Sequence, residues 1–353
     1  MSKIPFPAPP ADSAEVIALR SEFRAFLAEQ LASRTARQRS DNWYGYDRAF
    51  SRAMGQTGYL GMTWPKQYGG HERTAFERAV VVEECLAAGA PVGAHWIADR
   101  QSGPSILKFG TEAQKQAILP GIAAGELSFG IGMSEPDSGS DLAATRTKAV
   151  RDGDVYRVTG TKVWTSFAHE ADYVILFCRT QGTPADRHKG TSQLLVDLKN
   201  TPGLTIKPII DQAGQHHFNE MHFEDAVVPA DMLLGEEGQG WDQVMSELAF
   251  ERSGPERFLS SIELLLQLVA LNVEIFLITV EHVNHGFEHR LVVGGGCSGE
   301  CGLRFLKPCR QLVALIAQFL LFVGEREDAL RYRQTFFGIA NHRSDTPAFV
   351  IQL

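Results

Sequence analysis

The first third of the chain carries apolar residues at helical spacing. From Asp12 onward, apolar side chains recur every three or four residues, which indicates a helix with one buried face. These side chains are Val16, Leu19, Phe23, Phe26 and Leu27. Asp12 or Ser13 is placed to cap the start of the helix. Residues 76–88 and 111–124 repeat the pattern, the second with Thr111 as its expected N-cap, so this part of the chain is predicted to be helical.

The pattern changes to short β-rich runs near Phe129. Expected strands include Val155–Thr159, Tyr173–Phe177, Gln193–Leu198 and Leu204–Pro208. Turn pairs such as Asp152-Gly153 separate the strands, and Trp241–Phe250 has helical spacing again. This order predicts an α+β fold with segregated layers rather than a doubly wound sheet. The expected domains are a helical domain at 1–128, an antiparallel β domain at 129–240 and a C-terminal helical domain at 241–353.

Composition narrows the class of protein. The chain has 353 residues, 44% of them hydrophobic and 22% charged, which is enough for more than one core. Its net charge of -8 comes from scattered acids and argues against nucleic acid or an anionic membrane as partner. The first ten residues lack the pattern of a signal or transit peptide, so a cytoplasmic protein is expected. Five cysteines are an odd number, and Cys85 and Cys178 in apolar surroundings are expected to be reduced thiols.

A polar loop lies where helices give way to strands. Residues 132–142 read Gly-Met-Ser-Glu-Pro-Asp-Ser-Gly-Ser-Asp-Leu, a composition that alone fits any surface turn. Residues 161–169 follow with Thr-Lys-Val-Trp-Thr-Ser-Phe-Ala-His, and 228–241 end in Gly-Glu-Glu-Gly-Gln-Gly-Trp. The glycines of this last segment fit a linker between domains better than a dinucleotide fingerprint, because no βαβ unit surrounds them.

In order and spacing these segments resemble the acyl-CoA dehydrogenase family, over roughly residues 15–260. Upstream, Trp64–Gly70, Glu83-Glu84 and Phe109–Pro120 match as well. The resemblance implies an N-terminal helical domain, a middle antiparallel β-barrel domain and a C-terminal helical bundle. It also implies FAD as the cofactor, because dehydrogenation of an acyl thioester removes a hydride that no amino-acid side chain accepts.

The resemblance assigns residues to the flavin and to the substrate. Those at the flavin ring are Ile131, Gly132, Met133 and Ser134 from the first motif and Trp164, Thr165 and Ser166 from the second. Trp164 is expected to shield one face of the ring. The hydroxyls of Ser134, Thr165 or Ser166 are expected to bind its polar edge. Ser140 matches a position that contacts the thioester substrate.

The resemblance places the catalytic base on a helix. The chain lacks the late Tyr-Glu-Gly loop in which the family commonly carries its glutamate, but Leu248–Arg252 resembles the helix-borne form of the isovaleryl and long-chain branches. Glu251 is therefore the expected acceptor of the α proton. Ala249, Phe250 and Arg252 are its expected neighbours at the substrate. The alternative reading of Glu251 is a solvated helix carboxylate paired with an arginine.

The resemblance ends at about residue 260. Apolar stretches at 262–280 and 311–323 flank a glycine- and cysteine-containing segment, 293–301. Acidic residues interrupt the first stretch, which favours a buried bundle helix over a membrane span. Three histidines, at 282, 285 and 289, share a helical face, but the cysteines beyond them lack the close pairs of zinc sites, so no metal is expected. An incomplete or altered bundle is expected, and a frameshift would explain it.

The predicted activity is FAD-dependent α,β-dehydrogenation of an acyl-CoA to a 2,3-enoyl-CoA. An electron-transferring flavoprotein or a similar acceptor is expected to take the electrons, and a homo-oligomer or hetero-oligomer is expected if the C-terminal bundle is competent. Two alternatives stay open: a catalytically impaired family member that acts as a subunit or interaction partner, and a flavin-dependent acyl-CoA oxidase. Acyl chain length or ring character depends on pocket depth, which no motif reveals.

Overall fold

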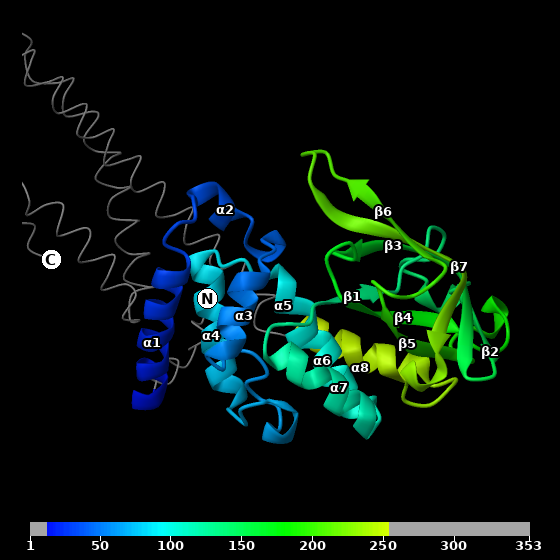
Figure 1. The fold of residues 1–353 in the computed structure, drawn as a ribbon, viewed down its shortest axis with the longest axis horizontal. Helices are drawn as coiled ribbons and strands as arrows, with labels where there is room; N and C mark the ends of the chain where they lie inside the picture. The colour runs from blue at the N-terminus through cyan, green and yellow to red at the C-terminus, as the bar shows by residue number, and fades with distance from the viewer. Residues whose placement is uncertain (1–12, 254–353) are drawn as a thin grey trace, which may run out of the picture. The chain divides into compact units, whose positions relative to one another are not determined.

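The computed structural model describes residues 13–253, where a helical part is followed by a β-rich part and one further helix (Figure 1). This order confirms the predicted α+β class. The predictions for residues 254–353, among them the altered bundle and the three histidines, lie outside the described residues.

Helix α1, Ala14–Gln30, has the cap and the buried face that its sequence predicts. Ser13 Oγ accepts a hydrogen bond from the Val16 amide at 3.4 Å. The apolar side chains of the predicted face are buried, except Phe26, which is half-buried. The other helices are α2 (Ala36–Ser40), α3 (Arg48–Gln56), α4 (Ala75–Ala88), α5 (Gly93–Ile97), a π-helical turn (Ala98–Ser102), α6 (Gly103–Phe109) and α7 (Glu112–Ala123).

Helix α7 confirms the prediction that Thr111 caps it. Thr111 Oγ1 accepts from the Gln114 amide at 3.2 Å, and Gln114 Oε1 accepts from the Thr111 amide at 3.0 Å. This reciprocal pair satisfies two amides that a helix start leaves unbonded. The Gln114 side chain also donates to the carbonyls of Asp231 and Leu233, at 2.6 and 2.9 Å, and so ties α7 to the segment before the last helix.

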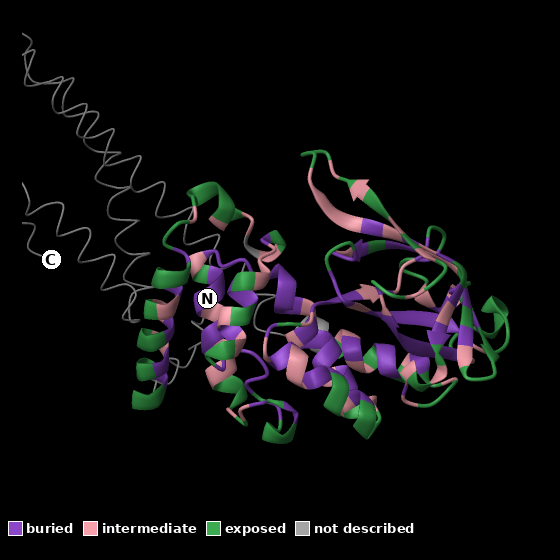
Figure 2. Ribbon diagram, in the orientation of Figure 1, coloured by how far each residue is buried: buried purple, intermediate pink, exposed green. Residues whose placement is uncertain are grey.

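The core of the helical part is apolar and aromatic. Phe23 is fully buried, and its ring packs edge-on against Tyr59 with centroids 4.5 Å apart. Burial of each such side chain contributes roughly 1.5–3 kcal/mol. The cluster around it includes Leu19, Leu27, Phe50, Met54, Val81, Leu86 and Trp96. Figure 2 shows α1 buried on one side and exposed on the other, as expected of an amphipathic helix.

The β-rich part is one sheet whose neighbours follow the order β6-β7-β3-β2-β4-β5-β8, with β1 paired to β4. A hairpin joins β2 to β3, and Asp152 pairs with Val155 across the predicted Asp-Gly turn. The strands are β1 (Phe129–Gly132), β2 (Lys148–Asp152), β3 (Val155–Ser166), β4 (Tyr173–Arg179), β5 (Thr191–Asp197), β6 (Leu204–Ile210), β7 (His216–Pro229) and β8 (Leu233–Leu234).

One part of the fold prediction needs correction, because the sheet is not wholly antiparallel. β1 runs parallel to β4, with Phe129 opposite Tyr173 and Gly132 opposite Leu176. β2 meets β4 in a single parallel pair. Parallel strands need a long crossover connection, and the segment between β1 and β4, which contains the β2–β3 hairpin, supplies it. Local spacing of apolar residues carries no signal for such a pairing.

Polar contacts join the two parts of the structure. Arg48 of α3 donates to Asp172 Oδ2 at 2.7 Å, and the same carboxylate accepts from the Ser128 amide at 2.8 Å, just before β1. The last helix, α8 (Gly240–Ser253), is anchored to β5 by Gln193 Nε2, which donates to Glu247 Oε2 at 2.9 Å. Both ends of the β-rich part are therefore tied to helices.

Cys85 and Cys178 are buried free thiols, as expected. Burial raises the pKa of Cys178 to about 12. Between residues 13 and 253, every helix is too short or too polar to cross a membrane. In the same range, no group of three or more His, Cys, Asp or Glu side chains is arranged to hold a metal ion.

Candidate functional site

The structure brings together the two segments that the sequence motifs single out, 131–134 and 164–166. Just beyond β1, Ser134 O accepts a hydrogen bond from the Val163 amide of β3 at 2.9 Å. Within β1, Gly130 packs so closely on β3 that an added Cβ would lie 3.2 Å from Thr165 Cγ2. The end of β1 therefore lies along the end of β3.

A β-bulge in β3 turns Trp164 outward. Lys162 pairs with Met221 and Thr165 with Asn219, so β3 carries one more residue than β7 between these pairs. Trp164 has a φ of 62°, a left-handed conformation that costs a bulky residue about 1–3 kcal/mol. Its side chain is 60% exposed. The chain thus holds a large indole at the surface in a strained conformation, beside the end of β1.

A buried amide supports the residue after the bulge. Asn219 Nδ2 donates to Thr165 O at 3.0 Å. Asn219 Oδ1 lies 3.1 Å from His169 Nδ1 and 2.8 Å from His216 Nε2, and these two imidazoles stack with centroids 3.7 Å apart. Burial, followed by the neighbouring His216, lowers the pKa of His169, which favours a neutral ring. The Thr165 carbonyl is therefore held from inside the sheet.

The residues that the sequence assigns to the flavin differ in how accessible they are. Thr165 is fully buried, and its Oγ1 makes no hydrogen bond within the described part of the chain. Gly132 is buried as well. The Thr165 hydroxyl is therefore not accessible to a ligand, whereas the hydroxyls of Ser134 and Ser166 are partly accessible beside the exposed indole, and groups of this kind can orient a flavin and tune its electronics. The half-buried members are Ile131, Met133, Ser134 and Ser166.

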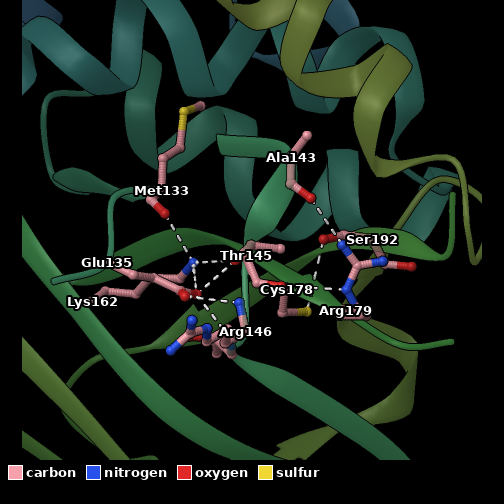
Figure 3. A network of polar contacts seen from close by, with 10 residues as sticks. Met133, Glu135, Ala143, Thr145, Arg146, Lys162, Cys178, Arg179 and Ser192 are labelled. Atoms are coloured by element: carbon pink, nitrogen blue, oxygen red, sulfur yellow. Dashed lines mark hydrogen bonds and ion pairs between the residues drawn. The ribbon is translucent and has the colours of Figure 1, made fainter. Parts of the chain in front are cut away.

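A buried ion pair joins β3, just before the Trp164 bulge, to the end of the first segment, and sequence reasoning missed it. Lys162 of β3 is fully buried, and its Nζ lies 2.8 Å from Glu135 Oε1. Nζ also donates to Met133 O at 2.9 Å and to Thr145 Oγ1 at 3.1 Å. Figure 3 shows these groups converging on the ammonium from the end of β1 and from the loop before β2. One side chain of β3 therefore holds the end of β1.

The Glu135 carboxylate is saturated with hydrogen bonds. Oε1 accepts from Thr145 Oγ1 at 2.6 Å and from the Thr147 amide at 2.9 Å, and Oε2 accepts from the Arg146 amide at 2.7 Å. Burial alone would raise the pKa of Glu135, but the charge of Lys162 and these hydrogen bonds outweigh it and lower the pKa to about 2. Burial lowers the pKa of Lys162, and Glu135 opposes that shift. The three oxygen acceptors around Nζ, a carbonyl, a carboxylate and a hydroxyl, match the three donors of an ammonium.

The loop that follows the first motif is anchored by a buried arginine. Arg179 of β4 donates to the carbonyls of Ala143 and Thr145, at 3.1 and 3.3 Å, and to those of Arg187 and Lys189 in the β4–β5 loop. At the surface, Arg187 pairs with Asp141. Ser140, the predicted substrate contact, is exposed beside this pair.

The predicted base lies on a helix, as its motif indicates. Glu251 belongs to α8, which follows the sheet directly. Ala249 is exposed. The side chains of Phe250, Glu251 and Arg252 lie outside the described residues, so their roles stay predictions.

Glu135 and Lys162 stand inside the two quoted motifs, yet they received no role from the sequence. A lysine within a β-rich run is usually solvent-exposed, since lysine is almost never fully buried unless it is paired. The usable signal in the sequence was that one motif contains the acidic Glu135 and the other contains the basic Lys162. Opposite charges in two segments that must meet are candidates for a buried ion pair.

Comparison with known proteins supports one family. Residues 13–126 match the acyl-CoA dehydrogenase N-terminal domain, and residues 130–226 match its middle domain. Acyl-CoA dehydrogenase FadE29 of Mycobacterium tuberculosis is 42% identical over 236 residues, which are 66% of this chain and 60% of that protein. The chain thus spans about three fifths of that relative's length.

Solved structures agree. A structure described as the Tcur3481-Tcur3483 steroid ACAD is 34% identical and superposes with a TM-score of 0.67, covering 75% of this chain and 68% of the other. The ChsE4-ChsE5 complex from Mycobacterium tuberculosis is 38% identical with a TM-score of 0.60, covering 69% and 61%.

Proposed function

The chain belongs to the acyl-CoA dehydrogenase family, and on that premise we propose that the protein binds FAD and dehydrogenates an acyl-CoA to a 2,3-enoyl-CoA. Members of this family are flavoproteins, which supports FAD as the cofactor. When bound, FAD supplies the acceptor for the hydride that leaves the β carbon of the thioester.

The observation that carries this proposal is the strained, exposed Trp164 beside the end of β1. Strain in a bulky residue persists where the surrounding structure enforces it, and such residues cluster at binding sites. An indole here would cover one face of the isoalloxazine and exclude water from it. Ser134 and Ser166 would hydrogen-bond its polar edge, and Ile131, Gly132 and Met133 would supply the backbone at that edge.

Glu251 is the proposed base for the α proton. Dehydrogenation removes this proton together with the hydride, so a positioned carboxylate is required. Helix α8 carries Glu251 directly after the sheet, and Glu247, one turn earlier, is fixed to β5 through Gln193. The proposed substrate contacts are Ser140, Ala249, Phe250 and Arg252.

An electron-transferring flavoprotein is the proposed oxidant for the reduced flavin.

The names of two matched structures guide the choice of substrate and partner. One is a steroid ACAD and the other a complex of two different chains. We therefore propose a steroid-derived acyl-CoA as the first substrate class to test, and a hetero-oligomer as the assembly.

The decisive experiment is an anaerobic titration of the purified full chain. FAD binding gives a yellow protein, and an acyl-CoA substrate is expected to bleach it. Glu251→Gln should still bind FAD and acyl-CoA, but the rate of bleaching should fall by about a hundredfold or more, the usual size of a general-base contribution. The matched control is Glu236→Gln, which makes the same substitution at an exposed glutamate, and this variant should bleach at the wild-type rate. Bleaching by Glu251→Gln at the wild-type rate would contradict the assignment of the base.

A second candidate function is a subunit without activity of its own. The observation that favours it is that the matches to the family's domain models, 13–126 and 130–226, cover the N-terminal and middle domains. A protein that stays colourless with FAD, yet binds an intact family member, would support this function. Rapid hydrogen peroxide formation from acyl-CoA and oxygen would instead identify an oxidase.

A further inference from the structure

The buried pair Lys162–Glu135 lies directly behind the segments assigned above to the flavin. All three acceptors of the Lys162 ammonium belong to this region: Met133 O in the first segment, Glu135 in the loop after it, and Thr145 before β2. Lys162 itself precedes the bulge at Trp164 by two residues. The pair therefore contacts the first segment and lies next to the second along β3, and neither side chain is exposed to a ligand.

The contact to Met133 fixes the orientation of one peptide. The Met133–Ser134 peptide is planar and trans, so its carbonyl and its N–H point in opposite directions. Because the carbonyl is held on the Lys162 ammonium at 2.9 Å, the Ser134 N–H is directed away from the buried pair. The next carbonyl, Ser134 O, is held by the Val163 amide. Two consecutive carbonyls of the first segment are thus fastened to β3.

The anion keeps the ammonium in place. Glu135 accepts from Thr145 Oγ1 and from two successive backbone amides, so its position is set by the loop before β2. A buried pair of this kind is often no more stabilising than apolar side chains of the same volume. Stability alone therefore does not explain why charges stand here, whereas orientation of a peptide does.

We propose that Lys162 and Glu135 are positioning residues that hold the Met133–Ser134 peptide and the Trp164 bulge in one fixed relative arrangement, with the Ser134 N–H directed at the polar edge of the cofactor. The inference rests on the proposed function in one respect, the identity of that cofactor as FAD. The link between the segments is a property of the chain itself and can be measured without any ligand.

The test removes both charges at once. In the double variant Glu135→Gln/Lys162→Met no buried charge is left alone, and the apolar stem of the lysine is replaced. The matched control is Arg48→Met/Asp172→Asn, which removes a partly buried pair between α3 and the β-rich part, near the start of β1 rather than its end. Thermal unfolding shows that each protein is folded before the comparison is made.

The first readout is single-residue hydrogen exchange in FAD-free protein. The Val163 amide, bonded to Ser134 O, is expected to exchange about tenfold faster in the double variant, which corresponds to the loss of roughly one hydrogen bond's free energy. The control should leave it unchanged. Equal Val163 exchange in wild type and double variant would overturn the proposal, whether or not the protein binds FAD.

The second readout is FAD affinity, measured by flavin fluorescence, together with the visible spectrum of the bound flavin. The double variant should bind FAD about tenfold more weakly with a shifted spectrum, whereas the control should match wild type in both. Wild-type affinity and spectrum in the double variant would refute the positioning role at the cofactor. A wild-type chain that binds no FAD would defeat the proposed function and the cofactor half of this proposal, while the exchange result would still decide the link between the segments.

Discussion

The helical core and the polar centre of the sheet are held together by different forces. Around Phe23, most of the stability comes from apolar and aromatic side chains, although Arg20 and Arg24 of the same helix also pair with the buried Glu84 of α4. Behind the end of β1, a fully buried ammonium and a carboxylate with four hydrogen-bonding partners occupy a comparable interior position. Apolar packing tolerates small shifts, whereas directional bonds fix the orientation of peptides. The region proposed to orient the cofactor is the one built from directional bonds.

The largest expected loss of stability comes from Phe23→Ala in the apolar core of the helical part. The ring is fully buried against Tyr59, so its loss should lower the free energy of unfolding by about 3–5 kcal/mol, measured by urea denaturation. Ile17→Ala on the exposed face of the same helix should cost less than about 0.5 kcal/mol. The folded fraction of the Phe23 variant should keep its Val163 exchange rate. Faster Val163 exchange there would show that the two regions are not independent.

A buried histidine of the helical part makes its stability depend on pH. His95 of α5 lies 2.8 Å from Ser51 Oγ through Nδ1. Burial lowers its pKa from 6.5 to about 4; Asp99 opposes the shift and Arg78 adds to it. In the unfolded chain the ring takes up a proton below about pH 6.5. Because the folded pKa is the lower one, this stability is complete above pH 6.5 and is lost as the pH falls towards 4.

The measurement is urea unfolding at about pH 7 and about pH 5. We expect a loss of about 2 kcal/mol, from the pKa difference integrated over that interval. His95→Asn, which retains a polar group near Ser51, should flatten this dependence. Glu135 should not contribute in this interval, since its pKa moves from 4.5 to about 2 and its stability is lost only below pH 4.5. If the free energy of unfolding of His95→Asn falls between these two pH values as much as that of wild type, then groups other than His95 cause the pH dependence.

The same contrast explains what could be predicted from the sequence. The face of α1, the Thr111 cap and several strands follow from residues within a few positions of one another, and local rules suffice there. The β1–β4 pairing, the outward bulge at Trp164 and the burial of Lys162 depend on contacts between distant segments. From the strand alone, a lysine is expected at the surface and a tryptophan in the core, whereas Lys162 is buried and Trp164 is exposed. The resemblance named Trp164 as a ligand contact, but only the fold shows the strain that presents it.

A substitution at Trp164 is expected to change stability little and best separates binding from folding. Trp164→Gly relieves a left-handed φ of 62° that only glycine adopts freely, although glycine has more freedom to lose on folding. The two effects oppose each other, so the free energy of unfolding should change by about 1 kcal/mol or less. FAD affinity, measured by flavin fluorescence, should nevertheless fall, because the exposed indole is the proposed cover of the flavin ring and is not part of the core. Trp164→Phe keeps an aromatic wall and should recover part of that affinity. If Trp164→Gly instead unfolds the sheet, the indole is structural, and the strain at this position needs another explanation.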